Sequence, residues 1–226
     1  MKNLLVLLHL MVLCVSVVGC GKDSPMGPQG GEKQLSWPNG DIRQEGTYKD
    51  GLRDGKWVNY YQNGRISMEG NYKEGERDGS FFWYYESGQI SRQENYTAGE
   101  KDGRYVGYFE NGQILFEKHF KNGKEDGKAI LYYENGNIRD EKNYAEGEKS
   151  GKFVWYYESG RIKKEVNYTD GEKDGKYVEY YESGQIRFDR NYKDGKRDGK
   201  WVDFDEAGNT EEWCYEMGET IECPKD

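Results

Sequence analysis

The sequence predicts an all-β protein, built as an elongated single-layer array of antiparallel β-hairpins that repeat every 24 residues. Glycine recurs at this spacing from Gly40 to Gly208 without slippage, and two parallel glycine series begin at Gly51 and Gly55. Self-similarity at a fixed period is typical of repeat architectures, in which each unit packs only on its neighbours. No segment has helical periodicity. We therefore expect seven units over roughly residues 40–208.

Each unit contains one hairpin. In the unit of residues 54–77, Asn63-Gly64 separates two runs rich in aromatic and β-branched residues, residues 56–61 and 66–72. Asn-Gly between such runs favours a two-residue type I′ turn, which needs positive φ at both positions. Three units carry Ser-Gly instead. This turn would place Tyr61 opposite Ile66, and the polar stretch of residues 73–79 would be an outer loop between hairpins.

The first residues predict a leader segment rather than part of the fold. A basic start precedes an apolar run, residues 4–18, that is short for a membrane span and typical of a signal peptide. The run ends in Val-Val-Gly-Cys, which resembles the lipobox of bacterial lipoproteins. This resemblance implies a signal peptide over residues 1–19, lipid on Cys20 and a place in the bacterial cell envelope. Gly21 after the cysteine favours the outer rather than the inner membrane.

Two shorter segments flank the repeats. Residues 20–35 comprise the lipidated cysteine and a stretch rich in Gly, Pro and polar groups, which predicts a flexible tether. Residues 209–226 depart from the repeat and are expected to cap the open end of the array. Cys214 and Cys223 lie in this cap, and an oxidising compartment makes them a plausible disulfide. No metal site and no cofactor are predicted.

Composition excludes several classes of function. The chain has a formal net charge of −9, which argues against binding nucleic acid or anionic lipid through bulk charge. Its 20 tyrosines and 15% aromatic content exclude ordinary disorder. The membrane contact is therefore expected through the N-terminal lipid alone.

The repeat resembles a known family. The segments YYESGQI at residues 84–90, NY at 95–96 and DGRYV at 102–106 carry the motif. They are similar to the MORN-repeat superfamily, and within it to the bacterial variant known as the YwqK-type antitoxin repeat. The resemblance implies a MORN-like hairpin array over residues 36–208. It does not imply a function, because one fold hosts many functions, and a lipoprotein signal argues against a cytoplasmic antitoxin.

Alternation along the strands predicts two different faces. One face, here called the aromatic face, carries columns of rings that stack repeat on repeat. In its middle, hairpin pairing would set Trp83 beside Arg92 and Trp155 beside Lys164, two arrangements suited to cation–π contact. Further pairs there are Asn59 with Met68, Gly107 with Phe116, Leu131 with Asp140 and Glu179 with Phe188. We predict a ligand or partner groove along Trp83, Arg92, Phe116, Trp155, Lys164 and Phe188; the alternative is that these are exposed positions free to vary.

The other face, here called the ladder face, alternates Val-type residues with charges. Its acids are Glu45, Glu69, Glu117, Glu141, Glu165 and Asp189, with Gln93 intervening. Its bases are Lys56, Arg104, Lys128, Lys152, Lys176 and Lys200. The two ladders are expected to pair with each other as solvated ion pairs, rather than to bind a metal.

No pattern predicts an enzyme. The chain lacks a nucleophile elbow, a zinc-binding helix motif and a phosphate-binding loop. His119 stands at a position that is usually Asn in this repeat. A translational repeat gives paired carboxylates equal surroundings, whereas acid–base catalysis needs unequal ones. The sequence instead favours a non-catalytic scaffold that binds an unknown envelope protein. The alternative is a glycan binder that uses the aromatic face.

Overall fold

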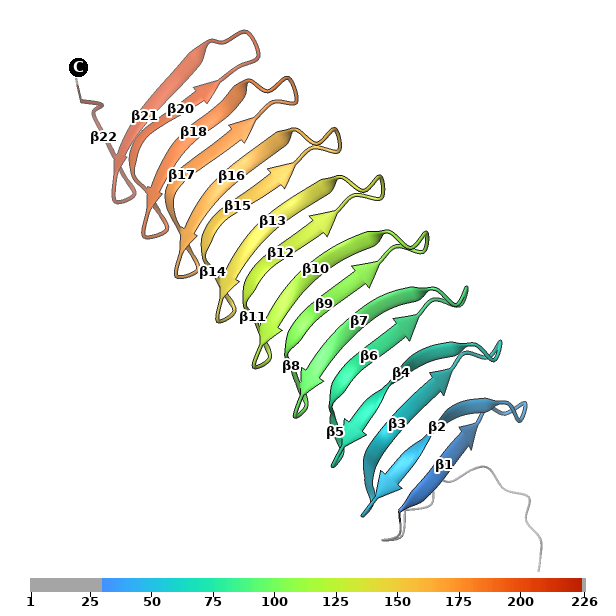
Figure 1. Ribbon diagram of the computed structural model, residues 1–226. Helices are drawn as coiled ribbons and strands as arrows, with labels where there is room; N and C mark the ends of the chain where they lie inside the picture. Colours follow the sequence, from blue (N-terminus) through green and yellow to red (C-terminus); the bar gives the residue numbers. More distant parts are fainter. Residues whose placement is uncertain (1–29, 225–226) are drawn as a thin grey trace, which may run out of the picture.

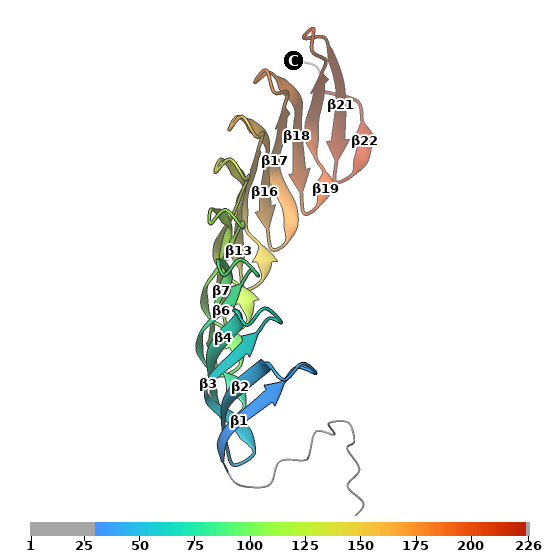
Figure 2. The ribbon, with the colours of Figure 1, turned by 90° about the vertical axis from the view of Figure 1, so that its right-hand side faces the viewer.

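The computed structural model describes residues 30–224, which form one open sheet of antiparallel strands with no helix among them. Figure 1 shows the hairpins stacked side by side in a long array, with the first and last hairpins at opposite ends. Figure 2 shows that the array is one layer thick and turns gradually along its length. The predicted all-β hairpin array is confirmed. Cys20 and the predicted signal peptide lie outside the described residues.

Each long strand pairs with the next long strand along the chain. The short strands pair with the strand before them and lead from one hairpin to the following one. The strands are β1 Gly31–Ser36, β2 Ile42–Lys49, β3 Leu52–Tyr60, β4 Ile66–Lys73, β5 Glu76–Arg77, β6 Gly79–Tyr84, β7 Ile90–Thr97, β8 Glu100–Lys101, β9 Gly103–Tyr108, β10 Ile114–Lys121, β11 Lys124–Glu125, β12 Gly127–Tyr132, β13 Ile138–Ala145, β14 Glu148–Lys149, β15 Gly151–Tyr156, β16 Ile162–Thr169, β17 Glu172–Tyr180, β18 Ile186–Lys193, β19 Lys196–Arg197, β20 Gly199–Phe204, β21 Thr210–Glu216 and β22 Glu219–Ile221.

The hairpin tips do not have the predicted two-residue turn. The amide of Gly64 donates to the carbonyl of Tyr61 over 3.0 Å, and the amide of Tyr61 donates to the carbonyl of Arg65 over 2.8 Å. These bonds close a three-residue loop in which Gly64, with φ 79°, follows an ordinary turn and forms a bulge. The register shifts there, so that Tyr60 rather than Tyr61 pairs with Ile66. The predicted pairing of Tyr61 with Ile66 is wrong.

This tip explains why Ser-Gly can replace Asn-Gly. At the tips of the described part of the chain, glycine is the residue with positive φ, and the residue before it is not. That preceding residue instead caps the loop with its side chain. Asn63 Oδ1 accepts the amide of Arg65 over 3.0 Å, and Ser183 Oγ accepts the amide of Gln185 over 3.4 Å. Either side chain can do this without a left-handed backbone.

The type I′ turn lies at the opposite end of the strands. Glu74 and Gly75 both have positive φ, 51° and 89°, and the flanking Lys73 and Glu76 pair with each other. Residues 73–79 are therefore a tight turn and the short strand β5, and the predicted outer loop is wrong. The positive-φ residue that precedes glycine in these turns is Asp50, Glu74, Ala98, Asn122, Glu146, Asp170, Asp194 or Met217.

A bulge follows each of these turns except the last, at Met217, where β21 and β22 pair in regular register. Tyr72 pairs with Arg77, but Glu69 pairs with Phe82, so the second strand holds two residues more than its partner between these pairs. The bulge falls at Asp78-Gly79, where the amide of Asp78 still donates to the carbonyl of Asn71 over 2.9 Å. Bulges bend the strand that carries them. The short strand before the bulge is thereby set at an angle to the strand after it.

The largest buried cluster lies on the aromatic face, while Val58, Val106 and Val154 are buried on the ladder face. Phe81 is 0% exposed, and its ring lies 5.3 Å from the rings of both Tyr72 and Tyr96 in edge-on contacts. Trp57 and Met68 complete the same buried cluster. Edge-to-face packing of aromatic rings adds to the free energy gained by burial. A single layer can bury these rings because long cationic side chains from the short strands lie over them.

The two predicted flanking segments differ in outcome. β1 begins at Gly31, so residues 31–35 belong to the sheet, and the predicted tether over residues 20–35 is too long at its C-terminal end. In the predicted cap, β21 pairs with β20 as a further hairpin strand, and β22 adds a short edge. A disulfide joins Cys214 to Cys223, with 5.0 Å between their Cα atoms.

Candidate functional site

The middle positions of the aromatic face form one continuous line across the sheet, here called the middle row. The predicted pairs within hairpins are present, Trp83 opposite Arg92 and Trp155 opposite Lys164 among them. Pairing between hairpins joins them, because Met68 also pairs with Trp83 and Lys164 with Glu179. Between Leu35 and Glu211, which pair with its first and last members, the row runs Gln44, Asn59, Met68, Trp83, Arg92, Gly107, Phe116, Leu131, Asp140, Trp155, Lys164, Glu179, Phe188 and Asp203.

Cations cover the rings of this row. The guanidinium carbon of Arg92 lies 4.1 Å from the centre of the Trp83 ring, and the ammonium of Lys164 lies 4.0 Å from that of Trp155. Burial lowers the pKa of Lys164 from its usual value. Contacts at this distance are within the range of cation–π attraction. One face of each tryptophan is therefore already occupied by a side chain of the protein itself.

The other two aromatic site residues have different neighbours. Phe116 covers Gly107 so closely that a Cβ atom at Gly107 would lie 2.4 Å from the Phe116 ring. Phe188 lies under Arg190, with 3.9 Å from the guanidinium carbon to the ring centre. The six predicted residues thus share one row, although they do not converge on one cavity.

A buried carboxylate stands beside the middle row, and the sequence reasoning missed it. Glu94 is only 3% exposed and lies 3.1 Å from the ammonium of Lys101 and 3.4 Å from Nε of Arg92. The hydroxyl of Tyr96 donates to the same carboxylate. Burial and this hydrogen bond raise the pKa of Tyr96 to about 12. The equivalent positions in the first two units are Gly46 and Gly70. The change from glycine to glutamate at Glu94 was the sequence signal that could have identified this carboxylate.

A line of cations, here called the cation row, extends along the short strands. Arg77 lies 5.2 Å from the ring centre of Phe81 and donates from Nη1 to the hydroxyl of Tyr96 over 2.6 Å. Its equivalents repeat this contact with the rings of their own units. The cation row comprises Arg53, Arg77, Lys101, Lys149, Lys173 and Arg197, and Glu125 stands at the remaining position. The sequence predicted residues 73–79 and their equivalents to be loops, so the cation row was not predicted.

On the ladder face the two ladders pair as predicted. Lys56 Nζ lies 2.9 Å from the carboxylate of Glu69, which also accepts a hydrogen bond from the hydroxyl of Tyr84 over 2.6 Å. The Tyr84 hydrogen bond, followed by that from Lys56, lowers the pKa of Glu69. Burial, followed by the bond to Glu69, raises the pKa of Tyr84 to about 12. Further pairs are Arg104–Glu117, Lys128–Glu141, Lys152–Glu165 and Lys176–Asp189.

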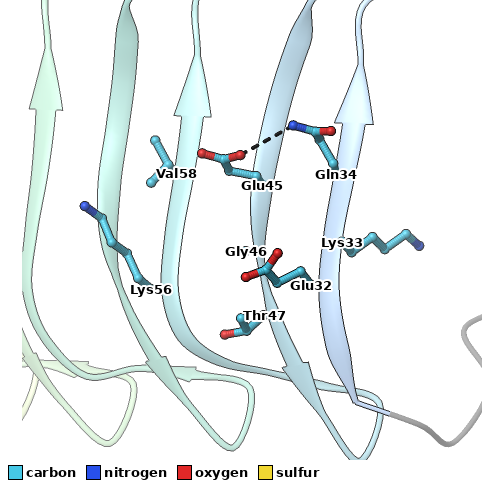
Figure 3. A pocket seen from close by; sticks show the side chains of 8 residues that line it. All are labelled: Glu32, Lys33, Gln34, Glu45, Gly46, Thr47, Lys56 and Val58. Carbon is cyan, nitrogen blue, oxygen red and sulfur yellow. Dashed lines mark hydrogen bonds between the residues drawn. The ribbon is translucent and has the colours of Figure 1, made fainter.

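The ladder changes sign at the first hairpin. Glu32 occupies the position that Lys56 holds in the next unit, and an open depression of about 520 Å³ lies beside it (Figure 3). In this depression Glu45 accepts hydrogen bonds from Gln34 over 3.5 Å and from Tyr60 over 2.5 Å. The depression opens on the ladder face, whereas the middle row lies on the aromatic face.

Some features are absent from the described residues. No group of His, Cys, Asp and Glu side chains within residues 30–224 could hold a metal ion. Over the same residues, no helix has the length and apolarity to cross a membrane.

Comparison with protein families supplies the identity of the repeat. The MORN repeat variant matches seven consecutive segments, residues 29–50, 53–74, 77–98, 101–122, 125–146, 149–170 and 173–194. The chain belongs to the MORN repeat variant family. From the second to the seventh, each matched MORN repeat begins at a position of the cation row or at Glu125. A search of curated proteins finds no match.

Proposed function

We propose that this MORN repeat protein is a non-catalytic, lipid-anchored scaffold of the bacterial cell envelope that binds a protein partner across its aromatic face. The middle row carries the proposal. It sets apolar, aromatic and charged groups in one line, in which Met68 and Asp140 are buried whereas both tryptophans and the cations over them are half-buried. Surfaces that mix aromatic anchors with arginine are typical of protein interfaces.

The anchor is the second part of the proposal. The sequence around Cys20 fits lipid attachment, and the finer resemblance to YwqK-type repeats is consistent with a bacterial source. Cys20→Ser should abolish incorporation of labelled palmitate and release the protein from the membrane fraction. Incorporation that survives this substitution would contradict the anchor.

Glycan binding is the second candidate, because Trp83 and Trp155 could stack on sugars. The cation contacts weigh against it: a neutral sugar would have to displace Arg92 or Lys164 from a ring face that it already covers. An acidic or amide-bearing protein partner can instead engage these cations where they lie.

Crosslinking on intact envelopes tests the scaffold. The tagged full-length protein is compared with a Trp155→Ala, Lys164→Ala variant and with a matched Lys152→Ala, Glu165→Ala variant of the ladder face of the same hairpin. Enriched proteins are identified by quantitative mass spectrometry. We expect one protein enriched with the wild type and with the ladder-face control, but lost with the aromatic-face variant.

Two results would count against this function. Enrichment that is the same in both variants would show that the aromatic face is not the interface. No enriched protein, together with retained envelope polysaccharide that the aromatic-face variant loses, would establish the glycan binder instead.

A further inference from the structure

The C-terminal half of the cation row lacks anionic partners. Within residues 30–224, Lys149, Lys173 and Arg197 form no ion pair with a carboxylate. Their contacts are with rings and a hydroxyl: Lys149 lies 4.9 Å from the ring centre of Tyr168, and Arg197 donates to the hydroxyl of Tyr215 over 3.3 Å. In the N-terminal half, Lys101 has the carboxylate of Glu94 at 3.1 Å, whereas Arg53 and Arg77 contact rings and tyrosine hydroxyls as the C-terminal cations do.

Neighbouring cations add to this excess of positive charge. Burial, followed by the charges of Lys164, Lys149 and Arg190, lowers the pKa of Lys173. The two acids of this part of the middle row are already engaged. Glu179 lies 3.3 Å from Arg187, and Asp203 lies 2.5 Å from Arg190. Lys173 thus has cationic neighbours and no carboxylate partner, although the chain as a whole carries a net charge of −9.

The spacing of these cations is set by the sheet. Lys149, Lys173 and Arg197 lie one unit apart, which is two strands, and strands are separated by about 4.8 Å. Successive cations therefore lie roughly 10 Å apart along the array. A peptide in the polyproline II conformation has three residues per turn and advances about 3.1 Å per residue, so carboxylates at every third residue lie on one side of it and recur at about the same interval.

We propose that Lys149, Lys173 and Arg197 bind an acidic polypeptide segment of the partner, laid along the array in the polyproline II conformation with a carboxylate at every third residue. This inference rests on the proposed scaffold function, because the acidic segment belongs to the protein partner that the scaffold binds. Three cations on one short line suit a short acidic segment, whereas a long polyanion would meet the net negative charge of the remaining chain.

The test measures binding of labelled peptides to the full-length protein in neutral detergent by fluorescence anisotropy. One peptide has three aspartates separated by two serines each, and a second has the same composition with the aspartates contiguous. The variant Lys149→Gln, Lys173→Gln, Arg197→Gln removes the three cations. The control Lys152→Gln, Lys176→Gln, Lys200→Gln removes the same charge from the ladder face, three residues further along each time.

We expect the spaced peptide to bind the wild type and the ladder-face control alike, and the cation-row variant about tenfold or more weakly. The contiguous peptide should bind the wild type more weakly than the spaced one. Equal loss in the two triple variants would overturn the proposal, because bulk charge would then explain binding. Equal affinity for the two peptides would overturn the claim that carboxylates at every third residue match the spacing of the cation row.

A salt titration of the wild type does not depend on whether any variant folds. Affinity for the spaced peptide should fall steeply as salt is raised, and an unchanged affinity would refute ionic binding. Failure here is also distinct from failure of the scaffold. Envelope capture that depends on Trp155 and Lys164, without any binding of acidic peptides, would retain the scaffold and reject this inference alone.

Discussion

The hydroxyl of Tyr61 donates a hydrogen bond to the backbone carbonyl of Tyr84, 2.5 Å away in the next repeat. The same bond recurs from Tyr85 to Tyr108, from Tyr133 to Tyr156, from Tyr157 to Tyr180 and from Tyr181 to Phe204. It ties each hairpin tip to its neighbour. Trp37 and Phe109 occupy the equivalent positions of two further hairpins and have no hydroxyl to donate.

Phe109→Tyr should therefore stabilise the array, because it restores a bond to the carbonyl of Tyr132. A typical hydrogen bond contributes about 1 kcal/mol. Urea unfolding should show a higher midpoint, and Tyr85→Phe should lower it by a similar amount. A neutral or destabilising Phe109→Tyr would show that the tip bond does not contribute to stability.

The disulfide should stabilise the C-terminal edge. Cys214 and Cys223 enclose a short loop, for which loop closure corresponds to about 2–3 kcal/mol. Reduction, or Cys223→Ala, should lower the melting temperature while leaving the sheet folded, since most hairpins do not contact this edge. Differential scanning calorimetry with and without reductant measures the effect. A melting curve that reductant leaves unchanged would contradict it.

Gly70 should tolerate no larger side chain. A Cβ atom there would lie 2.3 Å from the ring of Phe81, which is fully buried. Gly70→Ala should destabilise the protein by about 1–3 kcal/mol through overpacking. Combining it with Phe81→Leu should cost less than the sum of the two single changes, because the smaller side chain makes room. Strict additivity in denaturant unfolding would exclude this clash.

Acid should weaken the ladder face. The Tyr84 hydrogen bond and Lys56 lower the pKa of Glu69 in the folded protein, so this carboxyl stabilises the fold above its unfolded value of 4.5. The contribution is lost as the pH falls from there through the lowered folded pKa. Arg104 has the same effect on Glu117. The double variant Glu69→Gln, Glu117→Gln should show a shallower loss of melting temperature below this pH than the wild type, and identical acid profiles would contradict the argument.

Much of the fold could be predicted because strand side chains alternate with a period of two. Once a hairpin was placed at Asn63-Gly64, the pairing of Asn59 with Met68 followed, and it is correct. The turn type was wrong, because Asn-Gly fits both a type I′ turn and a turn with a glycine bulge. Only the backbone angle of Asn63 separates the two, and composition does not determine it.

The candidate site was predicted in part. Trp83 and Arg92 were paired correctly within their hairpin, but the contact of Trp83 with Met68 depends on register between hairpins. That register follows from the turn at Glu74-Gly75 and the bulge at Asp78-Gly79. Glutamate is a poor signal for a left-handed turn position. The stretch therefore resembled an irregular loop, and Arg77 and the rest of the cation row were missed with it.

The pairing of each strand with its chain neighbours has an evolutionary consequence. Duplication or loss of one 24-residue segment joins equivalent backbone positions, so it changes the length of the array by one hairpin and leaves every other pairing intact. The length of the array can thus vary among related proteins without a change in the surface chemistry of each unit. A duplicated unit adds its residues to both the middle row and the cation row.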